Sequence, residues 1–509
     1  MAARKVCSGV ATSLGGGALS LARPSTQKTT TPTQGINDIP GPWPSLPLVG
    51  TGWQYFPGGR YNLSNLHESS FDKFRRYGPV VREEFQWRRP VVHLFRPEDF
   101  QTVFQHQGRY PVRPVSEFVQ HYRLSNPDKY DTPGLANSVG EEWRRLRKML
   151  TPVLKRMSAL DDMVCDMDAL CEDFAEVIRA GREEGSCVVD NLQEYVYRLA
   201  LEAVYLLSLE VRLGCLEPRL SPSGDASAMI SSVKLLFEAF QELYYGLPLW
   251  KFVQTESYRK LDRAESTMYD VVSRRIREMI EEQPRTVQEP SPGQRPNVLQ
   301  SLLANKNLTE KEIRVTVIDF ISGGIFTVTN TFSFLLYHLS RNPDVQEKLY
   351  REVSDVMPDG VVTKDALKQM HYLKACVTES YRLTPTIPTI TRILPEDIEV
   401  SGYNIPAGVP LFCNFMVPCM QPDRFREPHR FEPDRWTDPD RKHNPWSILP
   451  FGYGNRMCVG KRFAELEMHS ALAKLVYRFK LESTGQEVKC KQAFIVVPSH
   501  PISIIFKDR

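Results

Sequence analysis

The sequence contains no closely spaced pair of cysteines. Its 10 cysteines are scattered over 509 residues, and none of them belongs to a Cys-x-x-Cys motif. Structural zinc sites and small disulfide-bonded domains usually show such spacings, so the pattern supports neither class and favours a reducing compartment. The net charge of +3 is also small for a chain of this length, so the composition indicates no nucleic-acid partner.

Long hydrophobic runs are also missing. The chain has no stretch of about 18 apolar residues, the length that a membrane-spanning helix requires. Hydrophobic residues nevertheless make up 41% of the sequence and charged residues 25%. These fractions are typical of a globular protein with a sizeable core, and they exclude a globally disordered chain.

Acidic residues are absent from the N-terminal segment. Residues 1–37 contain no Asp or Glu, and they combine a few basic residues with many Ser, Thr and small residues. The basic residues are Arg4, Lys5, Arg23 and Lys28. This composition is typical of a mitochondrial transit peptide; a disordered tail and a weak secretory signal at residues 6–14 are the alternatives. We predict a transit peptide at 1–37, a folded domain at 38–509, and a mitochondrial location in preference to the endoplasmic reticulum.

The most distinctive stretch is the glycine-rich segment 451–460, which reads FGYGNRMCVG. Glycines let a backbone approach a flat ligand without the clash of a Cβ atom. Cys458 lies just before an apolar, helix-period run at 463–477, and the N–H groups at a helix start favour a thiolate. Arg456 adds positive charge. A thiolate held in this way is a metal ligand or a nucleophile, and the ordinary alternative is a buried free cysteine.

The pattern F-x-x-G-x-R-x-C-x-G in this segment resembles the haem-binding signature of the cytochrome P450 family. The resemblance extends in order from about residue 39 to residue 506, and it implies a single-domain fold that is mainly α-helical with a small β-sheet region. It implies that Cys458 is the axial iron ligand of heme b (iron-protoporphyrin IX), where a thiolate favours O–O cleavage. The implied reaction inserts one atom of O2 into a C–H bond and releases the other as water.

Three further positions match contacts of this family to the haem propionates. Trp143 and Arg147 are four residues apart on a helix predicted to begin at Gly140, so they share a face. Arg392 follows a later helix. On their own these residues describe a solvated helix face with one packed tryptophan and a surface arginine. The resemblance assigns them, together with Arg456, to cofactor binding.

An ordered pair of motifs implies a structural network. Glu379 and Arg382 are three residues apart on a predicted helix, which alone is a common helix salt bridge. They precede the segment 431–436, FEPDRW, which resembles the family loop that supplies a second arginine, here Arg435. The resemblance implies that the three side chains form a buried network that positions the loop carrying Cys458.

A long central helix is predicted at 309–340, where Thr309 and Glu312 form a capping box. Gly323 and Gly324 in its middle cost stability, so they require a reason. Close passage of the helix over a flat cofactor supplies one.

The family motif on this helix ends in an acid followed by threonine. Thr327 matches the threonine that hydrogen-bonds iron-bound dioxygen, and it is the implied catalytic residue. Phe326 stands where the acid is expected. Since phenylalanine carries no proton, water or a nearby group has to supply it, and we expect a slower or less coupled enzyme that is still active.

Basic residues near the signature resemble a docking face for an adrenodoxin-like ferredoxin, the electron donor of the mitochondrial members of the family. They are Lys374, Lys461 and Arg462. An acidic partner requires such a face, although ordinary solvated surface charge is the alternative interpretation.

The predicted substrate cavity is apolar, which indicates a lipophilic substrate but is equally compatible with an ordinary core. Its segments are 112–118, 237–245, 325–326, 387–390 and 494–496. Other stretches resemble the ecdysteroid-hydroxylating members of the mitochondrial group and imply a sterol. These are 109–114, 244–251, 374–376 with 379–383, and 392–394. The alternatives are another mitochondrial steroid hydroxylase, a xenobiotic-oxidising monooxygenase, a haem sensor or isomerase-like relative that needs no electrons, and a structural protein without haem.

The segment 244–250, YYGLPLW, has two interpretations. It is either part of the core or an exposed apolar tip that dips into a membrane; the second implies peripheral association with the inner mitochondrial membrane. Secondary structure is predicted as a strand at 91–95, a helix from Arg96 onward, loops at 110–114 and then up to Ser138, and a buried strand at 494–498. Further helices are predicted at 159–184, 191–211, 229–243 and 258–282.

Overall fold

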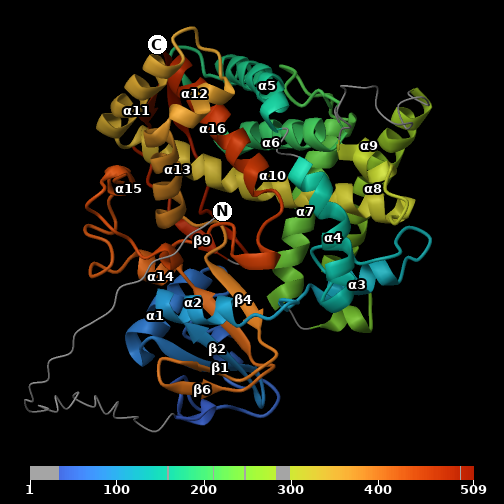
Figure 1. The fold of residues 1–509 in the computed structure, drawn as a ribbon, viewed down its shortest axis with the longest axis vertical. Coiled ribbons are helices and arrows are strands. Elements are labelled where there is room, and N and C mark those ends of the chain that lie inside the picture. Colours follow the sequence, from blue (N-terminus) through green and yellow to red (C-terminus); the bar gives the residue numbers. More distant parts are fainter. Residues whose placement is uncertain (1–33, 157–159, 210, 246–247, 283–297, 493) are drawn as a thin grey trace, which may run out of the picture.

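The fold was analysed in a computed structural model, which describes residues 34–156, 160–209, 211–245, 248–282, 298–492 and 494–509 (Figure 1). Most of the predicted transit peptide, residues 1–33, lies outside the described residues. The predicted boundary near residue 38 therefore stays a prediction.

Helices form most of the described chain. Their bounds are α1 Leu66–Tyr77, α2 Pro97–Gln105, α3 Glu117–Leu124, α4 Gly140–Arg156, α5 Leu160–Ala180, α6 Leu192–Leu209, α7 Asp225–Tyr245, α8 Glu256–Glu282, α9 Val298–Leu303, α10 Glu310–Ser340, α11 Pro343–Val356, α12 Lys364–Gln369, α13 His371–Leu383, α14 Met416–Cys419, α15 Asp434–Thr437 and α16 Lys461–Arg478. The predicted mainly α-helical fold is confirmed, and the long predicted helices appear as α5 to α8, α10 and α16 with ends shifted by a few residues.

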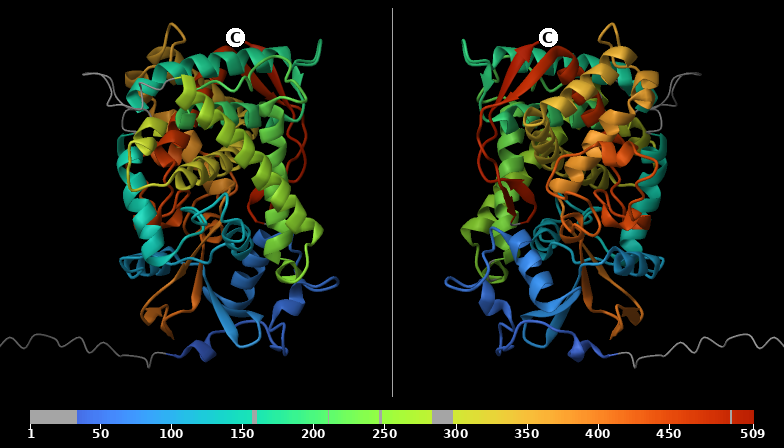
Figure 2. Two further views of the ribbon diagram at one scale, coloured as in Figure 1. Left: turned by 90° about the vertical axis from the view of Figure 1, so that its right-hand side faces the viewer. Right: turned by 90° about the vertical axis from the view of Figure 1, so that its left-hand side faces the viewer.

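The strands form one larger sheet and three small ones. Their bounds are β1 Val80–Gln86, β2 Arg89–Leu94, β3 Val188–Val189, β4 Thr389–Ile393, β5 Ile398–Val400, β6 Tyr403–Ile405, β7 Pro410–Asn414, β8 Phe479–Ser483, β9 Cys490–Gln492, β10 Val496–Pro498 and β11 Ile504–Asp508. The larger sheet has the order β1-β2-β7-β4, with β2 and β7 parallel and the other neighbours antiparallel. Figure 2 shows it below the helices, so the molecule has a helical part and a smaller sheet part.

Helix α10 crosses the helical part (Figure 1). Its predicted capping box is confirmed, since the Thr309 hydroxyl accepts from the Glu312 N–H at 3.1 Å and the Glu312 carboxylate accepts from the Thr309 N–H at 2.9 Å. Among the described residues α10 alone is long and apolar enough to cross a membrane, but 61% of its most apolar stretch is buried inside the protein. It is a core helix packed against α6 and α13.

The two glycines of α10 lie in different surroundings. A Cβ atom on Gly324 would lie 2.6 Å from Cγ2 of Val204 on α6, whereas nothing lies within 4 Å of the same atom on Gly323. Close passage over a flat cofactor was expected to explain both glycines. This explanation is wrong for Gly324, which is needed for helix packing. Gly323 alone faces open space.

One predicted loop contains a helix. The segment before Ser138 was expected to be irregular, but it includes α3. Phe118, Val119 and Tyr122 on this helix are buried, and their packing stabilises a short helix that the neighbouring prolines obscure in the sequence. The predicted strand at 91–95 and the helix start near Arg96 are confirmed by β2 and α2.

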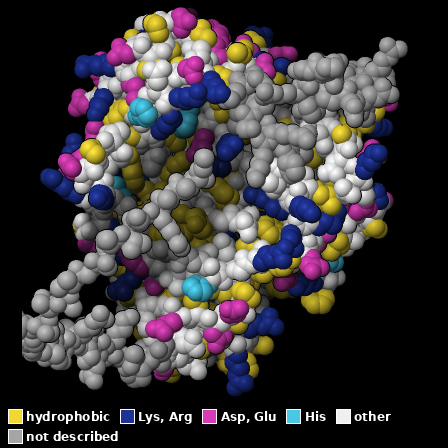
Figure 3. Space-filling view, in the orientation of Figure 1, with side chains coloured by type: hydrophobic (Ala, Val, Ile, Leu, Met, Phe, Trp, Pro, Cys, Tyr) yellow, Lys and Arg dark blue, Asp and Glu magenta, His cyan; other side chains and the backbone are white. Residues whose placement is uncertain are grey.

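Figure 3 shows one face of the molecule, in the orientation of Figure 1. A hollow near its centre has hydrophobic side chains inside, and Lys and Arg side chains lie along part of the rim.

Candidate active site at Cys458

The loop before α16 is shaped by two glycines. Gly452 and Gly454 have φ angles of 72° and 76°, a region that other residues rarely adopt. The Cys458 N–H donates to the Phe451 carbonyl at 2.8 Å, which closes the loop. Cys458 therefore lies at the end of a tight loop, three residues before α16 begins at Lys461.

The side chain of Cys458 is exposed, although many protein atoms surround it. Burial raises the pKa of Cys458 above its ordinary value, while the N–H groups of Gly460 and Lys461 and the charge of Arg147 act in the opposite direction. The expected thiolate preference is therefore wrong for the free side chain. The groups expected to favour a thiolate are in place, and a coordinated metal cation deprotonates such a thiol outright.

Four arginines gather near Cys458. They are Arg113, Arg147, Arg392 and Arg456. Burial, followed by the like charges of the other three, lowers the pKa of Arg456 to about 9. Burial also lowers the pKa of Arg392 to about 10. In the described part of the chain none of the four pairs with an acid within ion-pair distance, so the cluster has an excess of positive charge that an anionic ligand would neutralise.

Arg456 is held rigidly within this cluster. Its guanidinium donates to the carbonyls of Pro111 at 3.1 Å and Ser138 at 2.6 Å, and it lies 5.0 Å from the centre of the Trp143 ring. Its Nε is buried and has no hydrogen-bond partner among the described residues. The structure thus brings Trp143, Arg147 and Arg456 together.

Arg392 lies on β4, where its Nε donates to Gln107 at 2.9 Å and its guanidinium stacks 5.0 Å from the Phe104 ring. Gln107 was missed by the sequence analysis as a site residue, and Arg113 was predicted only as part of the substrate segment 112–118, not as a cofactor contact. Both lie in the irregular segment after α2, where no periodicity marks them, although Arg113 belongs to the stretch 109–114 that already resembles relatives.

The arginine cluster fits haem. Haem carries two propionate groups. Four arginines, of which Arg392 and Arg456 are buried, are the complement of two carboxylates, and the Arg456 Nε–H has no partner among the described residues. A cysteine on a tight glycine-containing loop in the same site supplies the thiolate that iron accepts.

Helix α10 presents Thr327 and Phe326 differently. The Thr327 hydroxyl donates to the Gly323 carbonyl at 2.7 Å, one turn back along the side that Gly323 leaves open. The Phe326 ring instead stacks on Phe237 of α7, with 4.0 Å between centroids and 10° between planes. Phe326 therefore packs between α10 and α7.

Aromatic rings connect four of the predicted substrate segments. Phe118 of α3 contacts Phe240 and Tyr244 of α7 at centroid distances of 5.2 and 5.1 Å, and Tyr244 stacks on Phe494 at 4.7 Å. The fifth segment joins the site through Ile390, which lies 3.7 Å from a Cβ placed on Gly452. An apolar wall thus forms from parts of the chain far apart in sequence.

Residues 40–506 match the family model that describes cytochrome P450. The chain belongs to the cytochrome P450 family. As a member it is a haem-dependent monooxygenase, which confirms the family resemblance seen in the sequence.

Curated P450 relatives cover nearly the whole chain. Ecdysone 20-monooxygenase of Drosophila melanogaster is 36% identical over 486 residues, which are 94% of this chain and 89% of the relative. Cytochrome P450 302a1, mitochondrial, of the same organism is 32% identical over 478 residues, 92% and 95% of the two chains. The 1,25-dihydroxyvitamin D(3) 24-hydroxylase, mitochondrial, of Rattus norvegicus is 29% identical over 491 residues, 94% and 90% of the two chains.

A buried charge network lies beneath the haem loop of this P450. Glu379 accepts two hydrogen bonds from Arg382, at 2.9 and 2.8 Å, and one from Arg435 at 3.0 Å. Burial alone raises the pKa of Glu379, but the two arginines outweigh it and hold the pKa below its usual range. The indole of Trp436 adds a further bond at 2.9 Å. That residue was missed because no motif position singled it out.

The predicted docking residues of the P450 lie together. Lys374 on α13 and Lys461 and Arg462 on α16 all act electrostatically on Glu465, whose pKa burial raises and these charges lower. Lys461 lies 3.8 Å from Glu465, and Lys374 donates to the Lys368 carbonyl at 3.0 Å. The three cations thus form one basic patch close to the Cys458 loop.

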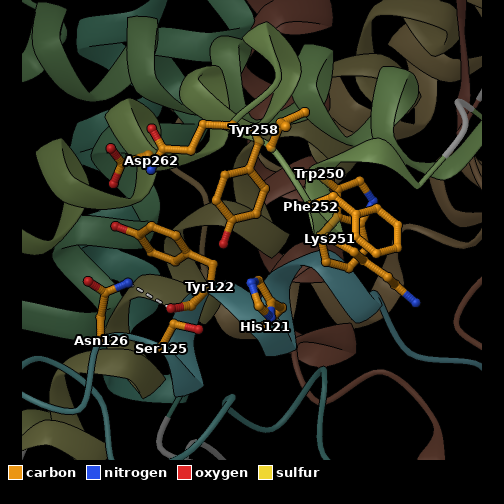
Figure 4. A pocket seen from close by; sticks show the side chains of 11 residues that line it. His121, Tyr122, Ser125, Asn126, Trp250, Lys251, Phe252, Tyr258 and Asp262 are labelled. Carbon is orange, nitrogen blue, oxygen red and sulfur yellow. Dashed lines mark hydrogen bonds between the residues drawn. The ribbon is translucent and has the colours of Figure 1, made fainter.

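A separate pocket of about 440 Å³ lies between α3 and the start of α8 (Figure 4). Trp250 and Tyr258 stack beside it, and Tyr122 and His121 approach from α3. Exposed apolar side chains border it: Phe252 is 85% exposed, and Leu249 and Val253 are also exposed. The segment 244–250 is thus divided, with Trp250 in the core and Leu249 at the surface.

Proposed function

We propose that this P450 hydroxylates a sterol, with ecdysone as substrate and 20-hydroxyecdysone as product. The observation that carries the proposal is the near full-length similarity to Ecdysone 20-monooxygenase, joined to the site formed by Cys458 and four arginines and to an aromatic wall. The alternatives are another mitochondrial steroid hydroxylase and a xenobiotic-oxidising monooxygenase.

In this proposal heme b is held by Cys458 and by the four arginines. Cys458 would be the iron ligand, while Arg456, Arg392, Arg147 and Arg113 would neutralise the propionates. Trp143 keeps Arg456 in place through the cation–π contact. When bound, the haem supplies activation of O2 at thiolate-ligated iron. In the same proposal, the network of Glu379, Arg382 and Arg435 holds the Cys458 loop in a fixed position.

The aromatic wall suits a rigid, hydroxylated hydrocarbon. The aromatic wall supplies flat apolar surface, and the hydroxyls of Ser116 and Tyr244, 2.5 Å apart, supply a polar pair at its end. Arg113 adds N–H donors. Ecdysone combines an apolar ring system with several hydroxyl groups, so apolar contact provides affinity and the polar groups fix orientation.

We assign electron supply to a reduced adrenodoxin-like ferredoxin, which would dock on the basic patch of Lys374, Lys461 and Arg462. Two electrons, O2 and two protons are consumed for each hydroxylation. Thr327, hydrogen-bonded to the Gly323 carbonyl, would accept a hydrogen bond from a proton-carrying water at its hydroxyl oxygen.

We further propose that the protein is imported into mitochondria and associates peripherally with the inner membrane. Residues 1–37 carry the basic, acid-free composition of a transit peptide. Two groups of exposed apolar side chains support membrane contact. Leu249 and Phe252 follow α7, and Trp43 and Leu48 precede α1.

The test is turnover of the purified holoenzyme with a mitochondrial-type ferredoxin, its reductase and NADPH. Ecdysone should yield a 20-hydroxylated product, identified by mass against a standard, and omission of ferredoxin should abolish it. A normal thiolate-type CO spectrum without product would overturn the substrate assignment and direct attention to other sterols and xenobiotics. Absence of a Soret band would overturn the haem assignment.

A further inference from the structure

Asp319 is a buried acid on α10 that the proposed chemistry has not yet used. Its side chain is 10% exposed. Oδ1 accepts a hydrogen bond from Arg123 at 2.8 Å, whereas Oδ2 is buried and has no hydrogen-bond partner among the described residues. An unpartnered carboxylate oxygen in such a place indicates an ordered water or another donor.

The ion pair alone does not explain Asp319. Arg123 already binds both oxygens of Glu265 on α8, at 3.3 and 2.9 Å, and Tyr130 donates to the same carboxylate at 3.1 Å. Two carboxylates thus share one guanidinium, and Glu265 alone would neutralise it. The second acid is therefore in excess of what neutralising Arg123 requires.

Asp319 lies one turn before the open position at Gly323 on α10, and its Oδ2 lies 2.4 Å from a Cβ atom placed on Gly134. Asp319, Gly323 and Thr327 follow one another at intervals of four residues, so they lie on one side of the helix. Gly323 contributes no side chain, nothing lies within 4 Å of its absent Cβ, and its carbonyl accepts the Thr327 hydroxyl. The two ends are about 12 Å apart along the helix axis, a distance that about three waters at ordinary hydrogen-bond spacing would bridge.

Asp319 and Cys458 both lie within electrostatic range of Arg113. Burial lowers the pKa of Arg113, and the negative charges of Asp319 and Cys458 both act against that shift. Arg113 is thus close enough to sense the acid on α10 and the cysteine of the haem loop.

We propose that Asp319 organises the water chain that delivers protons to Thr327, the task that position 326 cannot perform in this protein. Phe326 is an aromatic residue stacked on Phe237, so neither its chemistry nor its direction serves proton transfer. Each turnover consumes O2, the C–H bond, two electrons from reduced ferredoxin and two protons, and yields the alcohol and water. The protons come from solvent, pass Asp319 and end in the water formed. The inference rests on the proposed monooxygenase function but is independent of which sterol is oxidised.

The test compares Asp319→Asn with Glu265→Gln in the full-length holoenzyme. Both substitutions remove one carboxylate from Arg123, but only the first removes the acid on α10. Asp319→Asn should lower product per NADPH by about tenfold, less than the ~10² of a group that transfers the proton directly, with a matching rise in released hydrogen peroxide. The solvent deuterium isotope effect on turnover should rise. Glu265→Gln should retain wild-type coupling.

Two further measurements separate a proton-delivery role from a structural one. Haem content and the unfolding midpoint should be no lower for Asp319→Asn than for Glu265→Gln. Turnover driven by added hydrogen peroxide, which brings its own protons and electrons, should be the same in Asp319→Asn as in the wild type. Asp319→Glu should restore much of the coupling. Unchanged coupling and isotope effect in Asp319→Asn, or equal loss in both variants, would overturn the proposal.

Failure of the substrate assignment can be distinguished from failure of the proposal for Asp319. If ecdysone gives no product, coupling is measured with the sterol or xenobiotic that gives the largest Soret shift. The comparison of the two variants then proceeds unchanged.

Discussion

Gly324 of α10 packs against Val204 of α6 so closely that a methyl group in place of its hydrogen would lie 2.6 Å from Cγ2 of the valine. Its neighbour Gly323 has nothing within 4 Å of the same position. Adjacent glycines in one helix therefore have different purposes. Gly324 permits two core helices to meet, whereas Gly323 keeps a strip of α10 open in front of Thr327.

Alanine substitutions should separate the two roles. Gly324→Ala should destabilise the protein by about 1–3 kcal/mol, because the contact with Val204 forces α6 and α10 apart. Gly323→Ala should stabilise it by up to about 1 kcal/mol, because alanine favours the helix and meets no neighbour. Urea unfolding followed by helical circular dichroism measures both. Val204→Ala should relieve much of the penalty at 324, and equal effects at 323 and 324 would contradict this account.

The network around Glu379 should be essential for folding. Glu379→Gln leaves Arg382 and Arg435 buried, at most 1% exposed, without their shared counter-charge. Removing one partner of a buried ion pair costs about 3–5 kcal/mol, so we expect a lower unfolding midpoint and faster loss of haem. The control Glu427→Gln breaks the exposed pair with Arg430 and should cost less than about 1 kcal/mol. Similar midpoints for the two variants would be incompatible with a structural role for the network.

Sequence motifs predicted the parts of the site that local chemistry specifies. The glycine loop with Cys458 and the paired Glu379 and Arg382 are recognisable because their spacing is short and their residue types are required. Periodicity likewise identified the long helices, since a buried helix face repeats along the chain.

Other features depend on contacts between distant segments. Arg113 and Gln107 join the site because the segment after α2 folds onto the Cys458 loop, and no local pattern reports that contact. The ring of Phe326 was predicted to leave a gap in proton delivery, but its stacking on Phe237 could only be seen in the folded chain. The free thiol of Cys458 departs from expectation because burial outweighs the nearby N–H groups.

Glu467 should make stability depend on pH. It is buried on α16, neither carboxylate oxygen has a partner among the described residues, and burial raises its pKa well above the ordinary value. The unfolded carboxyl loses its proton near pH 4.3, to within about one unit. The folded state then binds more protons than the unfolded state, so stability falls as pH rises above about 4 toward the raised folded pKa.

Glu467→Gln should remove this dependence. The amide keeps the shape but does not titrate, so the variant should be more stable than the wild type at pH 7 and should lose less stability between pH 5 and 7. Unfolding by urea at a series of pH values measures the slope. The exposed Glu487→Gln is the matched control and should retain the wild-type slope; a wild-type slope in Glu467→Gln as well would exclude Glu467 as the cause.

Charge reversal on the basic patch should weaken the binding of ferredoxin. The double substitution Lys461→Glu and Arg462→Glu replaces two cations beside the Cys458 loop. At low salt, the concentration of an acidic ferredoxin that gives the half-maximal rate should therefore rise about tenfold. The maximal rate at saturating ferredoxin should change little, because the electron path itself is intact. The difference should shrink as salt screens the charges. Lys306→Glu combined with Arg219→Glu, an exposed double reversal far from α16 in sequence, changes the net charge by the same amount and is the control. The Soret band of each variant verifies that haem is retained. A donor requirement that rises equally in both proteins would show that net charge, and not this patch, attracts the ferredoxin.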